Sequence, residues 1–177
     1  MTIPSVKEIN PHVVDRLLRI KAFLLDVDGV LTDGSVTITE NGLDNRVFTV
    51  MDAESIQTAQ RIGIRIGIIT THASDLVLHR ARELGIHDIY HGMFDKTEAY
   101  KEFKALYQLK DESIAYMGDG ILDVSVLKSV GFAATPSNAH ISARMAAHYV
   151  SHYRGGYGAV REVLMMLVRV RSGDDEA

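Results

Sequence analysis

Short apolar runs that alternate with helical segments constrain the fold of this chain more than any other feature. The apolar runs fall at residues 22–25, 64–69, 88–90, 113–117, 132–134 and 148–150. The helical segments lie at residues 55–61, 75–84, 97–107, 122–130, 138–147 and 158–171. Strands that alternate with helices of this length pair in parallel through right-handed crossovers. The pattern therefore predicts an α/β fold with a doubly wound parallel sheet.

The ends of the chain carry weaker signals. Asn10-Pro11 is typical of a helix start, which predicts a short helix before residue 21. We expect the tail from about residue 171 to be disordered. No linker or internal repeat divides the 177 residues, so we expect one domain over residues 1–177 with a substantial core.

A hairpin is expected directly after the first strand. Polar and apolar residues alternate over residues 35–39, Asn41-Gly42 is a turn signal, and residues 47–50 can supply the return strand. The hairpin is short and polar on one side. We interpret residues 35–50 as a flap beside the main sheet.

Composition excludes several classes of function. The formal net charge of −4 gives no basic surface for nucleic acid. The chain contains no cysteine, which excludes disulfides and thiolate metal sites and fits a reducing compartment. Neither a secretory signal nor an apolar run long enough to cross a membrane is present. We therefore expect a cytoplasmic protein with no membrane partner.

The predicted strands end in unusual polar residues. Asp26 and Asp28 follow the first strand, Thr70 ends the second, and Asp119 follows the strand at 113–117. In a parallel sheet these ends meet at one edge, where ligands bind. Carboxylates that lie close together repel and are costly to desolvate, unless a divalent cation with oxygen ligands compensates them. A solvated acidic turn is the alternative reading of Asp26 and Asp28.

Lys96 lies at the start of a predicted helix. Together with these strand-end residues it gives, in chain order, aspartate, hydroxyl, lysine and a further acid, on alternating strands and helices. The set resembles the haloacid dehalogenase superfamily of phosphoryl-transfer enzymes. That resemblance implies a Rossmann-like, three-layer α/β domain and Mg²⁺ as the cofactor. It implies that Asp26 is the nucleophile that forms an aspartyl-phosphate, and that Asp28 is the general acid and base.

The same resemblance assigns the remaining site residues. Asp26, Asp119 and the backbone carbonyl of Asp28 would bind the metal ion. Thr70 and Lys96 would hold the transferring phosphoryl oxygens. Asp123, one helical turn after Asp119, would orient the metal site without binding the ion. The alternatives for Thr70, Lys96 and Asp123 are an ordinary strand end and two ordinary positions in a first helical turn.

Two segments, at residues 26–34 and 154–163, indicate which branch of the superfamily this chain resembles. They are similar to small phosphatases that act on 3-deoxy-octulosonate 8-phosphate and related sugar acids. This similarity implies no large cap domain and a homotetramer in which hairpins and C-terminal segments of neighbours close each site. It implies substrate binding by Asp52, His72 and Arg80, and by the glycines Gly155 and Gly156. A plain loop before a final core helix is the alternative for the two glycines.

Several positions depart from that pattern. Met51-Asp52-Ala53 stands where these enzymes typically have Arg-Asp-Gly, and His72 stands where they have arginine. Gln57 occupies a further position that is usually basic in these enzymes, whereas Arg80 retains the expected positive charge. The substrate therefore stays open between octulosonate 8-phosphate, a nonulosonate phosphate and another small metabolite. A non-catalytic oligomerisation module, like that fused to sialic-acid cytidylyltransferases, is the alternative from another class.

Overall fold

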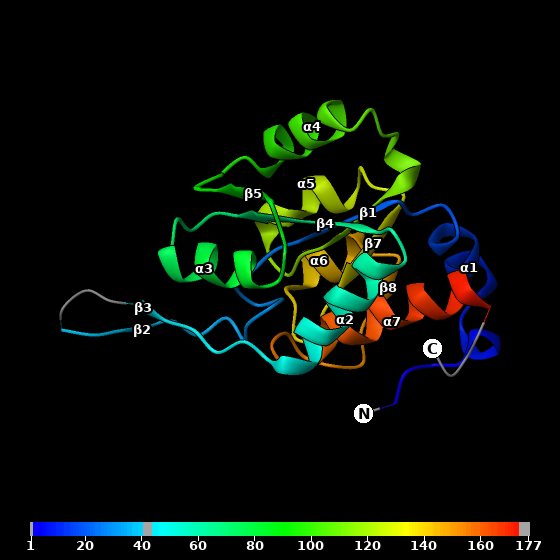
Figure 1. The fold of residues 1–177 in the computed structure, drawn as a ribbon, viewed down its shortest axis with the longest axis horizontal. Helices are drawn as coiled ribbons and strands as arrows, with labels where there is room; N and C mark the ends of the chain where they lie inside the picture. Colours follow the sequence, from blue (N-terminus) through cyan, green and yellow to red (C-terminus); the bar gives the residue numbers. More distant parts are fainter. Residues whose placement is uncertain (1, 41–43, 174–177) are drawn as a thin grey trace.

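The computed structural model describes residues 2–40 and 44–173 and shows a six-stranded sheet between two layers of helices (Figure 1). The strand order is β5-β4-β1-β6-β7-β8, and every neighbouring pair is parallel. The strands are β1 (Ala22–Leu25), β4 (Arg65–Thr70), β5 (Asp88–His91), β6 (Ile114–Met117), β7 (Phe132–Thr135) and β8 (Tyr149–Val150). The predicted doubly wound α/β fold is confirmed.

The helices divide between the two faces of the sheet. Side chains of α1 (Pro11–Leu17), α2 (Val50–Arg61), α3 (Asp75–Glu83) and α7 (Ala159–Ser172) belong to one hydrophobic cluster. Those of α4 (Lys96–Leu106), α5 (Val124–Leu127) and α6 (Ile141–Ala146) belong to the other. Strand β1 is buried throughout, with Phe23 and Leu25 in the first cluster and Leu24 in the second. The three layers follow from this alternation.

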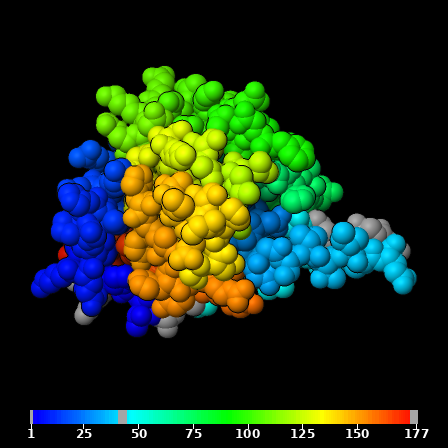
Figure 2. Space-filling model, turned by 180° about the vertical axis from the view of Figure 1, so that it is seen from behind, coloured from blue at the N-terminus to red at the C-terminus, as the bar shows by residue number. Residues whose placement is uncertain are grey.

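The hairpin lies where it was expected, but its return strand does not. Strands β2 (Thr37–Ile38) and β3 (Asp44–Asn45) pair antiparallel and project from the body of the molecule (Figures 1 and 2). The prediction that residues 47–50 form the return strand is wrong. Thr49 caps α2 by accepting a hydrogen bond from the Met51 amide, so the helix begins at Val50. The predicted turn at Asn41-Gly42 lies outside the described residues.

Two other boundaries differ from the predictions. The predicted helix at 122–130 is a 3₁₀ turn, η3 (Ile121–Asp123), followed by the short α5. Helix α7 continues to Ser172, and the Arg171 guanidinium donates to the Ile20 carbonyl. The predicted disorder from about residue 171 is therefore contradicted for Arg171 and Ser172. Short 3₁₀ turns also occur at η1 (Val6–Glu8) and η2 (Asp111–Ser113). Within residues 2–40 and 44–173, no helix has the length and apolar character to span a membrane.

Candidate active site

The carboxyl ends of three neighbouring strands carry the predicted site residues. Asp26 follows β1, Thr70 ends β4 and Asp119 follows β6, while Lys96 opens α4. A pocket of about 250 Å³ lies at this edge of the sheet. It is lined by Asp26, Asp28, Thr71, His72, Lys96, Asp119, Gly120, Ile121, Leu122 and Asp123. Sequence positions that are far apart therefore share one cavity, as the strand pattern predicted.

Lys96 lies between two buried carboxylates in this pocket. Its Nζ is 2.8 Å from Oδ2 of Asp26 and 2.6 Å from Oδ1 of Asp123. Burial alone would lower the pKa of Lys96, but the charges of Asp26 and Asp123 outweigh it and raise that pKa above its usual value. Lys96 is thus held as an ammonium ion. The two carboxylates also offset the unfavourable position of a cation at a helix start.

Three carboxylates gather around this single ammonium. One oxygen each of Asp26, Asp119 and Asp123 lie within 4.8 Å of one another. When all three acids are ionised, the group carries two more negative charges than Lys96, their only ion-pair partner among the described residues, can neutralise. Burial, followed by repulsion from Asp123, raises the pKa of Asp26 and raises that of Asp119 to about 6. A divalent cation with oxygen ligands fits this donor set and its charge.

The hydrogen bonds of Asp123 separate its role from that of the other two acids. Its Oδ1 is bound by Lys96 and by the Tyr116 hydroxyl, and its Oδ2 accepts the amides of Asp119 (3.0 Å) and Gly120 (2.8 Å). Each Asp123 oxygen therefore has two contacts, whereas each Asp26 oxygen has one, from the Val27 amide at 2.7 Å and from Lys96 at 2.8 Å. This arrangement leaves Asp26 and Asp119 as the acids that can hold a metal ion, with Asp123 fixing the loop beneath them.

Gly29 allows the first loop to approach Asp119. A Cβ atom at Gly29 would lie 2.1 Å from Oδ2 of Asp119, and the backbone there has φ +85°. Any side chain would therefore displace the Asp119 carboxylate and strain the loop. The sequence Asp-x-Asp-Gly thus brings the acids after β1 and β6 together.

The Asp28 carboxylate lines the same pocket and is bound by Arg46 and His72. Its carboxylate accepts two hydrogen bonds from Arg46, from Nε to Oδ1 at 2.7 Å and from Nη2 to Oδ2 at 3.2 Å. Nδ1 of His72 lies 3.1 Å from Oδ2. The side chain of Asp28 is therefore placed at the rim, which suits the expectation that only its backbone carbonyl meets a metal ion.

Two residues of the site escaped the sequence analysis. Arg46 follows the hairpin strand β3 and reaches Asp28 across 18 positions. Tyr116, in β6, joins Lys96 and Asp123 through its buried hydroxyl. Neither residue belongs to a recognisable motif. A lone cation beside a polar hairpin was the only available signal for Arg46.

The predicted substrate-binding residues separate into two groups. His72 lines the pocket, and its amide donates to the buried Thr70 hydroxyl oxygen at 3.3 Å. Arg80 instead pairs with Glu83 on the surface of α3 at 3.1 Å. Asp52 is buried at the start of α2, where its Oδ1 accepts the Arg161 amide of α7 at 2.8 Å. The structure therefore brings neither Arg80 nor Asp52 into the pocket.

Gly155 and Gly156 pack against the loop that follows β1 in the same chain. The Gly156 amide donates to the Val30 carbonyl at 3.0 Å. A Cβ atom at Gly155 would lie 1.8 Å from the Gly29 carbonyl oxygen, so no side chain fits there. The two glycines therefore pack against the loop after β1 and lie outside the lining of the pocket.

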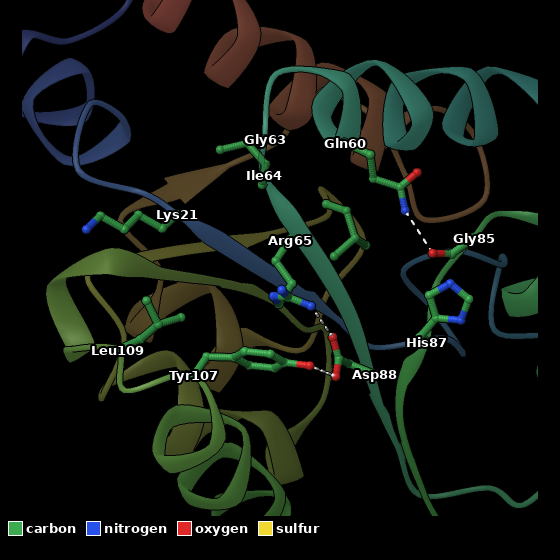
Figure 3. Close-up of a pocket in the computed structure, with 11 residues that line it drawn as sticks. Lys21, Gln60, Gly63, Ile64, Arg65, Gly85, His87, Asp88, Tyr107 and Leu109 are labelled. Atoms are coloured by element: carbon green, nitrogen blue, oxygen red, sulfur yellow. Dashed lines mark hydrogen bonds and ion pairs between the residues drawn. The ribbon is translucent and has the colours of Figure 1, made fainter.

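A second pocket lies at the opposite, amino-terminal edge of the sheet (Figure 3). Arg65, at the start of β4, stacks 3.8 Å above the Tyr107 ring and reaches Asp88 at 3.5 Å. The Tyr107 hydroxyl donates to Asp88 at 2.5 Å. Arg65 and Asp88 are paired with each other, and the residues that line this pocket include none of the predicted catalytic set.

Comparisons with known proteins agree with this geometry. Residues 41–164 match the model of a family described as haloacid dehalogenase-like hydrolase. The chain is 36% identical over 169 residues to the 3-deoxy-D-manno-octulosonate 8-phosphate phosphatase KdsC of Salmonella typhimurium, covering 96% of this chain and 90% of the relative. KdsC of Escherichia coli K12 is 34% identical over the same shares of the two chains.

Solved structures of similar proteins have the same fold. The 3-deoxy-D-manno-octulosonate 8-phosphate phosphatase of Yersinia pestis has a TM-score of 0.91 at 35% identity, covering 93% of this chain and 89% of that one. The Moraxella catarrhalis phosphatase, in complex with a magnesium ion, a phosphate ion and KDO, has a TM-score of 0.90 at 32% identity, covering 93% and 94%. The chain belongs to the haloacid dehalogenase-like hydrolase family.

Proposed function

We propose that this chain is an Mg²⁺-dependent phosphatase of a phosphorylated sugar acid, 3-deoxy-octulosonate 8-phosphate or a related nonulosonate phosphate. The observation that carries the proposal is the pocket in which Asp26, Lys96 and Asp119 meet beneath Asp28. The names of the similar proteins support the choice of substrate. Residues 1–177 would form one hydrolase domain.

The chemistry divides between Asp26 and Asp28. Asp26 attacks the phosphorus atom, so that an aspartyl-phosphate bond forms and the bond to the sugar oxygen breaks. Asp28 gives a proton to the leaving alkoxide. Asp28 then takes a proton from the water that attacks phosphorus, which releases inorganic phosphate and restores the Asp26 carboxylate.

The other residues neutralise and position charge. Asp26, Asp119 and the Asp28 carbonyl would hold Mg²⁺, which when bound lowers the negative charge on the phosphoryl group. Lys96 and Thr70 would hold the transferring oxygens, and Asp123 and Tyr116 keep Lys96 in place. His72 lies beside Asp28 in the same pocket and would contact the departing sugar acid.

We further propose that the protein works as a cytoplasmic homotetramer. Exposed apolar side chains cluster near the hairpin and the start of α2, with Ile38, Val47 and Val50 each more than 60% exposed. A neighbouring subunit that covered them would shield the site from water, which strengthens the electrostatic interactions within it. The absence of cysteine fits a reducing compartment.

The test is phosphate release from a panel of sugar-acid phosphates, with and without Mg²⁺. Wild type should hydrolyse at least one of them only with Mg²⁺, and Asp26→Asn should lower kcat by at least about 10³-fold because the amide cannot act as the nucleophile. Equal rates for the two proteins would overturn the proposal.

The same panel separates the alternatives. Hydrolysis of other metabolites in preference to sugar acids would favour a different substrate, as the missing cations at Met51 and Gln57 allow. Failure to bind Mg²⁺ and to cleave any ester, by a protein that still forms tetramers, would favour the non-catalytic oligomerisation module.

A further inference from the structure

The hairpin supplies the partner of the proposed general acid. Arg46 follows strand β3, and its side chain is 1% exposed although the hairpin projects from the body of the molecule (Figure 2). Its guanidinium contacts both oxygens of Asp28, at 2.7 and 3.2 Å. Nη1 also reaches the Ser74 hydroxyl, ahead of α3, at 3.4 Å. Arg46 therefore links the hairpin, the loop after β1 and the start of α3.

This contact fixes the direction of the Asp28 carboxylate. A planar guanidinium that binds both oxygens holds the carboxylate in its own plane, whereas a single contact leaves the carboxylate free to rotate. The alignment of a proton donor with the leaving oxygen determines how well it works. No other described residue contacts both oxygens of Asp28.

The bidentate contact still leaves room for a proton. A carboxylate has about four lone-pair directions on its two oxygens. Arg46 contacts both oxygens, and Nδ1 of His72 also lies 3.1 Å from Oδ2. Oδ1 thus has fewer contacts than Oδ2 and is the oxygen suited to exchange a proton with the substrate.

We propose that Arg46 is a positioning residue, which aligns Asp28 for proton transfer to the leaving group and couples that alignment to the hairpin. The inference rests on the proposed function, since it requires Asp28 to act on a phosphate ester. The effect of Arg46 should therefore depend on how much the leaving group needs a proton. An alkoxide needs one, whereas a nitrophenolate is stable without it.

The experiment measures kcat/KM for three phosphate esters with wild type and with Arg46→Gln. The esters are the sugar-acid phosphate, a pentose 5-phosphate that has no carboxylate, and p-nitrophenyl phosphate. We expect Arg46→Gln to lose at least about tenfold more on both alkyl esters than on the aryl ester. Arg46→Lys should recover only part of the loss, because an ammonium ion cannot bind both oxygens in one plane.

A double-mutant cycle with Asp28→Asn makes the test specific. If Arg46 acts through Asp28, adding Arg46→Gln to Asp28→Asn should cause little further loss on the alkyl esters. Arg65→Gln, which removes an arginine from the pocket of Figure 3, is the matched control and should leave all three values unchanged. Circular dichroism of each variant checks that it is folded.

Other outcomes contradict the inference in distinct ways. An equal loss on alkyl and aryl esters would assign Arg46 to general structure or to the phosphoryl site. A loss confined to the sugar-acid phosphate would assign Arg46 to binding of the substrate carboxylate. If wild type hydrolyses none of the esters, the proposed function itself fails, and a role in proton transfer falls with it.

Discussion

The two pockets at opposite edges of the sheet differ in how their charges are balanced. At the carboxyl edge, Lys96 pairs with Asp26 and Asp123, all three of these residues are buried, and the half-buried Asp119 lies beside the two acids. At the amino edge, Arg65 faces Asp88 alone, and its side chain is 49% exposed. Both edges contain close ion pairs, yet only the first leaves negative charge uncompensated.

This difference separates a functional site from a structural contact. An exposed pair such as Arg65 and Asp88 is screened by solvent and stabilises a protein only slightly. A buried excess of like charge costs stability, and a protein that contains one must compensate it with a ligand or an ion. The unbalanced pocket is therefore the one that we assign to chemistry, although it is smaller than the pocket at the amino edge.

The largest expected difference between the two edges comes from removing their cations. Lys96→Met should lower the free energy of unfolding by about 3 kcal/mol, because it leaves Asp26 and Asp123 buried without a counterion. It should also abolish phosphate release. Arg65→Met should cost no more than about 1 kcal/mol and should leave activity intact. Urea denaturation without metal ions measures both, and equal losses would remove the distinction.

Metal binding should also distinguish the two edges, with a somewhat smaller change in the free energy of unfolding. Mg²⁺ at about 100 times its Kd should raise the free energy of unfolding by about 2.7 kcal/mol, as expected for any ligand that binds only the folded state. Asp119→Asn should remove most of this gain, whereas Asp88→Asn at the other edge should keep it. Thermal unfolding at several Mg²⁺ concentrations tests the prediction. Equal stabilisation of the two variants would place the metal elsewhere.

Asp52 tests the rule that a buried, poorly compensated charge marks a functional site. It is buried and only partly compensated, but it lies in neither pocket. Its Oδ2 has no hydrogen-bond partner, and burial raises its pKa to about 6, against the stabilising amide of Arg161. A raised pKa means that the folded state binds the proton more tightly than the unfolded state. This contribution to stability is therefore lost as the pH rises from about 4 through 6.

Asp52→Asn should remove that pH dependence. Relative to wild type, the variant should gain up to about 3 kcal/mol in free energy of unfolding between pH 4 and pH 7, and less if the carboxylate relaxes toward water. Urea denaturation across this range measures the difference. A difference that does not change with pH would show that Asp52 is compensated in the folded state. If Asp52→Asn lost substrate binding without a change in stability, Asp52 would be assigned to the substrate site.

The sequence predicts the fold and the centre of the site because both depend on local patterns. Apolar runs that end in acids locate the strands, and parallel pairing then brings Asp26, Thr70 and Asp119 to one edge. A cation at a helix start, such as Lys96, is unfavourable unless a negative group compensates it. Asp26 and Asp123 are that compensation.

The remaining features depend on contacts that no short pattern contains. Arg46 meets Asp28 only because the chain that leaves the hairpin returns to the loop after β1, and the return strand was predicted several residues too late. Asp52 was expected at the substrate through a family motif, but the packing of α2 on α7 directs it to the Arg161 amide. Helix α5 begins at Val124, later than predicted, after a turn in which Asp123 accepts the amides of Asp119 and Gly120.

The close fit of Gly155 against the Gly29 carbonyl has a consequence for biosynthesis. The loop that bears Asp26 and Asp28 is translated early, but its rear support comes from a segment more than 120 positions later. That segment is anchored by Glu162, a buried acid that accepts the His152 amide at 2.9 Å. A nascent chain on the ribosome therefore cannot complete the packing of this loop until residues 155 and 156 have been synthesised.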